Sequence, residues 1–253
     1  MPLDRSPGRL PTLDSVSKPL RILLSPRWIL LAGVLLPSRA GMSEPQCTVT
    51  PFQIADSALR WMPASFRGQV SRHRPSFESG IRKVLSAHPA SPEEKSLLEK
   101  EIVEKTKSIA QKLRSRPKFG EVAIELGSLA PIILYLNIPD VDEACVERLN
   151  KAITCNADVF RLVVYNSSDQ QTDAKGIDRL IFSMRSRRAV LTEKFLANYS
   201  HLHENLTAER IDPKSALFGL SSLIYSHAVN DIATCWLWIW KSANGDMSGT
   251  ERE

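Results

Sequence analysis

The 253-residue chain is poor in the residues from which most enzyme sites are built. It has five histidines and four cysteines, and none of them forms a CxxC pair or a Cys/His cluster, which argues against a zinc finger. It also lacks a GxSxG motif, a glycine-rich phosphate loop and a Cys/His nucleophile arrangement. No single motif therefore names an enzyme class.

Little of the positive charge belongs to the part of the chain that we expect to fold. The net charge is +5, but residues 1–40 carry six basic and two acidic side chains. Residues 41–253 are therefore close to neutral. A general nucleic-acid-binding domain keeps its excess of lysine and arginine within the domain, so we expect no nucleic-acid partner.

The basic leader has the features of a secretory signal. Lys18, Arg21 and Arg27 precede an apolar run at residues 28–36, and Ser38-Arg39-Ala40 places small residues where a signal peptidase reads. The run is shorter than the roughly 20 apolar residues that span a bilayer, although an uncleaved interfacial anchor is the alternative. We expect cleavage near Ala40, a periplasmic or extracellular protein, and no transmembrane span in the mature chain.

The remaining sequence predicts one helical domain. Residues 1–40 are the leader, 41–50 a linker, 51–246 the domain and 247–253 a tail. Helical patterns cover residues 52–61 and 63–87, as short helices broken at Pro63 and Pro75, and then residues 91–116, 118–136 (with a kink or break at Pro131), 142–153 and 174–200. Only residues 160–165 resemble a strand. The predicted fold class is all-α, a multi-helix bundle.

The last helix is predicted to be the centre of that bundle. It runs from a cap at Asp212-Pro213 to about Lys241, ends at Asn244-Gly245, and carries apolar residues on all sides. Such a helix lies in a protein core or in a membrane. Because Asp231 would cost about 2.5–3.5 kcal/mol in the middle of a membrane helix, we expect a buried core helix.

Residues 126–139 (LGSLAPIILYLNIP) resemble the signature helix of the zinc-dependent phospholipase C family, which is similar in fold to zinc-dependent single-strand nucleases. That helix reads approximately L-G-x-x-A-H-x-x-x-D-x-N-x-P, with His and Asp as zinc ligands. Gly127, Asn137 and Pro139 are retained here, whereas Pro131 stands at the His position and Tyr135 at the Asp position. Weaker likenesses lie at residues 62–80 and 218–240.

The resemblance implies a bundle of the phospholipase C type, derived from enzymes that hydrolyse phosphoesters with three zinc ions. That chemistry needs many His and carboxylate ligands, and the two lost positions share one helix face. We therefore expect a non-catalytic protein with a binding or structural role and no cofactor. The alternative is a zinc-dependent hydrolase of phospholipids or nucleotides with a reduced metal site.

Two further groups are candidate sites. His227 and Asp231 are four residues apart and would give half a metal site, or else a buried His–Asp contact that ties the helix to a neighbour. Arg185, Arg187 and Arg188 would form a basic face for phosphate or lipid headgroups in a peripheral membrane contact, or else a solvated helix face.

The cysteines that remain after cleavage are Cys47, Cys145, Cys155 and Cys235. An exported protein can form disulfides, and Cys145 and Cys155 could pair across a helix end. Cys235 lies in the apolar last helix and is expected to be a small core residue.

Overall fold

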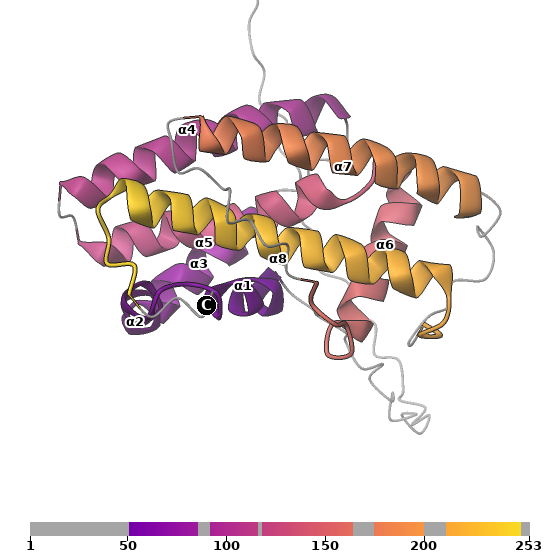
Figure 1. The fold of residues 1–253 in the computed structure, drawn as a ribbon, viewed down its shortest axis with the longest axis horizontal. Coiled ribbons are helices and arrows are strands. Elements are labelled where there is room, and N and C mark those ends of the chain that lie inside the picture. Colours follow the sequence, from indigo (N-terminus) through magenta and orange to yellow (C-terminus); the bar gives the residue numbers. More distant parts are fainter. Residues whose placement is uncertain (1–50, 86–91, 116–117, 164–174, 200–210, 249–253) are drawn as a thin grey trace, which may run out of the picture. The chain divides into compact units, whose positions relative to one another are not determined.

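A computed structural model describes residues 51–85, 92–115, 118–163, 175–199 and 211–248, which contain helices and no strand (Figure 1). The helices are α1 (Pro51–Leu59), α2 (Ala64–Arg72), α3 (Arg74–Leu85), α4 (Pro92–Arg114), α5 (Phe119–Asn137), α6 (Glu143–Asn156), α7 (Gly176–Tyr199) and α8 (Ala216–Ser242). The predicted all-α fold class is therefore confirmed. The leader, its cleavage site near Ala40, the linker and Cys47 lie outside the described residues.

Helices α5 and α8 form the middle layer and run antiparallel. At one end the Trp236 indole donates to the Leu126 carbonyl at 3.1 Å, and at the other the Asn137 amide donates to Asp231 at 3.0 Å. Helices α1 and α3 pack on one side of this pair, and α4 and α7 pack on the other (Figure 1). The bundle therefore has three layers.

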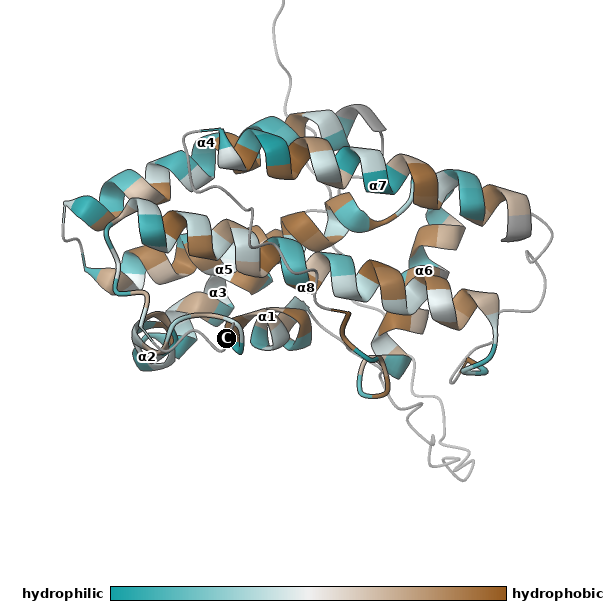
Figure 2. Ribbon diagram, in the orientation of Figure 1, coloured by the Kyte–Doolittle hydropathy of each residue, from teal (hydrophilic) through white to brown (hydrophobic). Residues whose placement is uncertain are grey.

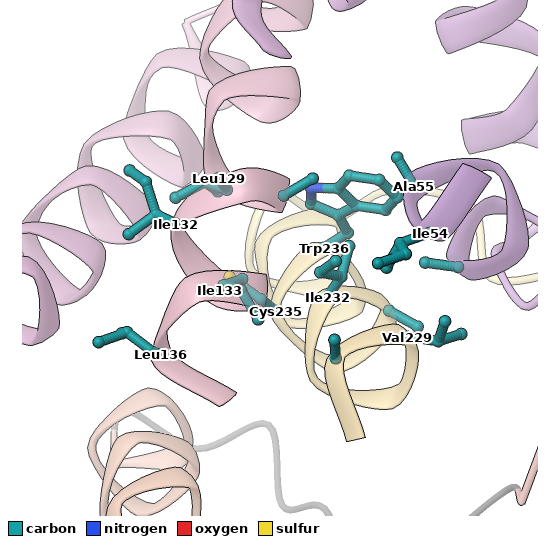
Figure 3. Close-up of a cluster of buried hydrophobic side chains, with 14 of the residues drawn as sticks. Ile54, Ala55, Leu129, Ile132, Ile133, Leu136, Val229, Ile232, Cys235 and Trp236 are labelled. Atoms are coloured by element: carbon teal, nitrogen blue, oxygen red, sulfur yellow. The ribbon is translucent and has the colours of Figure 1, made fainter. Parts of the chain in front are cut away.

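The core is centred on α8, as its sequence predicts. Trp236 is fully buried, with its ring 6.0 Å from that of Phe66 and 5.5 Å from that of Phe77. Figure 3 shows this indole beside Ile54 and Ala55 of α1. Apolar colour runs along much of α5 and α8, whereas polar and apolar segments alternate along α4 and α7 (Figure 2).

Helix α5 is long and apolar enough to cross a membrane, and it is the one such helix among the described residues. However, 61% of the apolar stretch is buried inside the bundle. Its position between α3, α4 and α8 accounts for this composition as that of a core helix.

Two glycines allow α3 and α5 to approach closely. A Cβ atom at Gly127 would lie 2.9 Å from the carbonyl carbon of Phe77, and one at Gly80 would lie 2.8 Å from that of Ile124. Both distances are shorter than a Cβ contact tolerates. The glycine at each position thus sets the spacing of the two helices.

Several predicted boundaries differ from the structure. Helix α2 ends at Arg72, so the break before α3 falls at His73 and Pro75 lies in the first turn of α3. Helix α5 continues through Pro131 without a break. Helix α8 begins at Ala216, because the Ser215 hydroxyl accepts from the Phe218 N–H at 3.1 Å and so caps the helix.

The strand predicted at residues 160–165 is not formed in its described part. Residues 160–163 are an irregular segment packed on α8. The Val163 N–H donates to the Ser226 hydroxyl, and the Asn230 amide donates to the Val163 carbonyl. Side chains of α8 therefore satisfy the backbone groups that a neighbouring strand would otherwise bind.

Cys145 and Cys155 cannot pair across a helix end, so the disulfide suggested by their positions in the sequence is wrong. Both lie in α6, ten residues apart, which separates them by about 15 Å along the helix. A disulfide requires Cα atoms about 4.4–6.8 Å apart. Cys235 is fully buried, as predicted, and burial raises the pKa of its thiol to about 12.

Candidate functional site

A hollow of the described structure lies beside α5 and forms a groove with a volume of about 1110 Å³. We call it the α5 groove. It is lined by residues of α1, α3, α4, α5 and α6 and by Ile138. Its apolar side chains include Ile54, Leu98, Ile124, Ile132, Leu134 and Ile138, and its charged ones include Glu94, Glu101, Glu104, Lys105, Lys112 and Glu125.

The groove follows two antiparallel helices. The Lys112 ammonium lies 2.5 Å from the Glu125 carboxylate at one end of the α4–α5 pair, and Lys95 donates to the Ile138 carbonyl at the other. Along α5 the lining runs from Ile124 to Ile138, the residue that follows the helix, over about 21 Å. The groove is therefore long, with an apolar floor on α5 and a charged wall on α4.

Pro131 and Tyr135, which replace the zinc ligands of the family that the helix resembles, both line this groove. Pro131 offers no side-chain donor atom. Burial raises the pKa of the Tyr135 phenol, and the nearby carboxylates of Glu94 and Asp140 raise it further. The Lys95 ammonium lies 5.0 Å from the centre of the Tyr135 ring. A proline, a protonated phenol and a nearby cation do not suit a zinc ion.

The remaining donors in the groove do not supply a substitute site. No group of three or more His, Cys, Asp or Glu side chains suited to a metal occurs among the described residues. Glu125 is paired with Lys112, and Glu101 with Lys105 at 3.0 Å. His88, His201 and His203 lie outside the described residues.

The retained motif residues hold the helices together. Gly127 permits the close contact with α3. The Asn137 amide donates to the Ile133 carbonyl at 3.0 Å and to Asp231 of α8. Pro139 is buried, and its carbonyl oxygen lies 3.4 Å from the Lys95 ammonium. All three residues thus contribute to the scaffold behind the groove.

His227 and Asp231 do not have the surroundings of a metal site. The Arg187 guanidinium donates to both oxygens of Asp231 at 2.6 Å, and Asn137 donates to one of them. A divalent cation would have to displace these donors against the charge of Arg187. Burial, with a smaller contribution from the charge of Arg187, lowers the pKa of His227 to about 4. The structure thus corrects the metal-site alternative and favours a polar contact, made through Asp231 to α5 and α7.

The three arginines of α7 do not form one basic surface, which corrects the predicted phosphate- or lipid-facing role. Arg188 is 8% exposed and binds the Leu136 carbonyl, Glu99 and Asp140. Arg187 turns toward Asp231, and Arg185, although 59% exposed, pairs with Glu99. The reason is that buried carboxylates on other helices require these guanidinium groups as partners.

A buried charge network lies beside the α5 groove. It comprises Lys95, Glu99, Asp140, Arg185 and Arg188, and it links α4, the end of α5 and α7. Burial lowers the pKa of Lys95, and the carboxylate of Asp140 opposes this shift. The sequence carries a signal for this network in the helical spacing of α4. Lys95 and Glu99 continue the buried stripe of Ile102, Thr106 and Ile109 on α4.

We compared the chain with protein-family models, curated proteins and solved structures, and none of them matches. The likeness to the phospholipase C family therefore rests on the residues of the α5 segment.

Proposed function

We propose that the protein is an exported binding protein that retains the scaffold of a zinc-dependent phospholipase C and holds a single-chain amphiphile in the α5 groove. The observation that carries this proposal is the position of Pro131 and Tyr135. Both side chains lie on the α5 floor of the groove, where the family's metal ligands would stand. An apolar surface thus replaces the hydrolytic centre.

The dimensions of the groove support a lipid-like ligand. One leaflet of a bilayer is about 15 Å thick, half of a hydrocarbon core of about 30 Å. The α5 floor, which is about 21 Å long, therefore accommodates one acyl chain and a polar group at its end. The volume of about 1110 Å³ lies just above the range of ordinary ligand pockets, which measure about 300–1,000 Å³.

The chemistry of the walls supports the same ligand. Isoleucine and leucine side chains give an apolar floor for a hydrocarbon chain. The Glu101–Lys105 and Lys112–Glu125 pairs give a polar edge whose charges are already balanced. An acyl chain that lies on the floor can leave both of these ion pairs in place.

The proposal is tested by binding of a fluorescent lysophosphatidylcholine, below its micelle concentration, to the purified protein. Ile124→Glu places a carboxylate on the floor of the groove, at a position that is 37% exposed and tolerates the change. We expect it to weaken binding by at least about tenfold, which corresponds to about 1.4 kcal/mol. The matched control is Leu196→Glu, an exposed position on α7 outside the groove, which should bind as the unaltered protein does.

The same samples separate binding from hydrolysis. The lipid recovered after incubation should be intact, with no phosphorylated headgroup released. Equal binding by the Ile124→Glu and unaltered proteins would contradict the groove as the site. Release of headgroup, lost on removal of zinc by a chelator, would instead establish the hydrolase alternative.

A further inference from the structure

The outer face of α7 carries a stripe of side chains that the bundle does not cover. Helix α7 lies in an outer layer beside α4 (Figure 1). Phe182 is 69% exposed and Leu196 52%, and Ala189, midway between them, is exposed too. At 3.6 residues per turn, a step of seven residues returns to within about 20° of the same side of a helix. The three residues therefore form one stripe about 21 Å long, with a small side chain at its centre.

Two side chains of opposite charge lie on this stripe at equal distances from Ala189. Arg185 is four residues before it and Glu193 four residues after it, about 6 Å away in each direction. Arg185 is 59% exposed and donates to Glu99 through Nε and Nη2, which leaves its Nη1 for a second acceptor. Glu193 is exposed and has no ion-pair partner within the described part of the chain.

This stripe is complementary to an antiparallel copy of itself. A two-fold axis through Ala189 brings each residue opposite the one that lies equally far on the other side of Ala189. Phe182 then meets the partner's Leu196, and Arg185 meets the partner's Glu193, and the symmetry makes each contact twice. A parallel pairing would instead place Arg185 against the partner's Arg185 and Glu193 against the partner's Glu193, which like-charge repulsion opposes.

We propose that the protein forms a two-fold symmetric homodimer through this stripe, with the two α7 helices antiparallel and crossing at Ala189. The apolar ends of the stripe cover each other, and the small residue at the centre allows the helix axes to approach closely. A second copy is the occupant because both the apolar side chains and the two charges find their complement in it. The mixed charges of this face match neither an acidic nor a basic surface.

The dimer is expected to be weak and does not depend on the α5 groove. The stripe is small beside a standard interface, which uses about 20–30 residues on each side, so the dimer should form as the protein concentration rises. No residue of α7 lines the α5 groove. The interface therefore uses none of the side chains proposed to bind an amphiphile.

Analytical ultracentrifugation of the full chain over a range of concentrations measures the dissociation constant. Leu196→Glu should raise it by at least about 100-fold, about tenfold for each of the two copies of this side chain in the interface. Glu193→Arg should raise it about fivefold, because two exposed ion pairs are replaced by two like-charge contacts. The matched control is Glu147→Arg, the same charge change at an exposed position of α6, which should dimerise as the unaltered protein does.

Disulfide cross-linking tests the register of the two helices. Ala189→Cys places the two new thiols at the two-fold axis, where a Cα separation of about 4.4–6.8 Å is within reach, so mild oxidation should link the subunits. The control is Ala197→Cys, exposed on the same helix. Its copy would lie about 24 Å away, so it should cross-link no more than the unaltered protein with its four cysteines.

A protein that stays monomeric at the highest concentration would overturn the proposal, as would a dimer that Leu196→Glu leaves unchanged or equal cross-linking at the two cysteine positions. A monomer that floats with phospholipid vesicles, and loses flotation with Phe182→Ser, would show that a bilayer and not a second copy covers this face. The Leu196→Glu protein should still bind lysophosphatidylcholine, so failure of the dimer and failure of the groove are distinguishable.

Discussion

The close contact of α3 with α5 predicts that a glycine-to-alanine change lowers stability at one position, Gly127, and raises it at another, Gly68. A Cβ atom at Gly127 would lie 2.9 Å from the carbonyl carbon of Phe77 and closer still to its oxygen, whereas ordinary contacts of this kind begin at 3.4 Å. The obstacle is backbone, which cannot rotate away. Gly127→Ala must therefore separate two packed helices.

The cost follows from two opposing contributions. Overfilling a packed interface costs about 1–3 kcal/mol or more, and alanine returns about 1 kcal/mol because it favours the helix over glycine. Since the clash is with backbone, we expect the packing cost to exceed the helical gain and the free energy of unfolding to fall by about 2 kcal/mol.

Gly68→Ala is the matched control. Gly68 lies inside α2, and a Cβ atom there would meet nothing within 4 Å. Only the helical gain remains, so stability should rise by up to about 1 kcal/mol. Urea unfolding of both variants, followed by circular dichroism, measures the two changes. A Gly127→Ala protein as stable as the Gly68→Ala protein would refute the close helix contact.

Two further predictions concern the buried charges. Burial raises the pKa of Asp231 to about 6, so the stability that the protonated carboxyl contributes is lost as pH rises from about 4 to 6. Burial lowers the pKa of His227 to about 4, so the stability that the neutral imidazole contributes is lost as pH falls from 6.5 to 4. The two groups therefore change stability with pH in opposite directions. The His227→Gln protein, which keeps Asp231, should lose stability as pH rises, and the Asp231→Asn protein, which keeps His227, should lose it as pH falls. Urea midpoints measured between pH 4 and 6.5 test this, and the same pH dependence in both variants would contradict it. Glu99→Gln removes from Arg185 and Arg188 a carboxylate that is 4% exposed, although Arg188 keeps its ion pair with Asp140. We therefore expect a cost of about 3 kcal/mol, the low end of the range for a broken buried pair. The control is Glu101→Gln, because Glu101 pairs with Lys105 on the surface of the same helix and should cost about 0.5 kcal/mol or less. Thermal unfolding measures both variants, and an equally small cost for Glu99→Gln would contradict the network.

The elements that the sequence predicts well are those with local signals. Helix α4 begins at Pro92 as expected, because serine followed by proline and glutamate is a local helix start. Asn244 has a φ of 57° and Gly245 follows it, so the predicted end of α8 is also confirmed. The start of α8 was predicted too early because Asp212 forms a turn of its own, in which its carboxylate accepts from the Lys214 N–H.

The candidate site could be predicted only in part, because its partners are distant in sequence. Pro131 and Tyr135 were identified from the α5 segment alone. The groove that they line also requires α1, α3, α4 and α6. Arg187 is 44 residues from Asp231, and Arg188 is 89 residues from Glu99. No local pattern reveals such pairs, so the sequence predicts a solvent-facing basic surface at Arg185, Arg187 and Arg188, where the structure has ion pairs with distant carboxylates.

The central claim is that the α5 groove holds an amphiphile, and photo-crosslinking tests it most directly. A lysophosphatidylcholine with a photoreactive acyl chain is bound to the full chain below its micelle concentration, irradiated, and its attachment sites are found by mass spectrometry. We predict attachment within residues 124–138, along α5 and just beyond its end, and at Leu98 of α4. Ile124→Glu should suppress this labelling. Attachment outside the groove, or labelling that Ile124→Glu leaves unchanged, would contradict the claim.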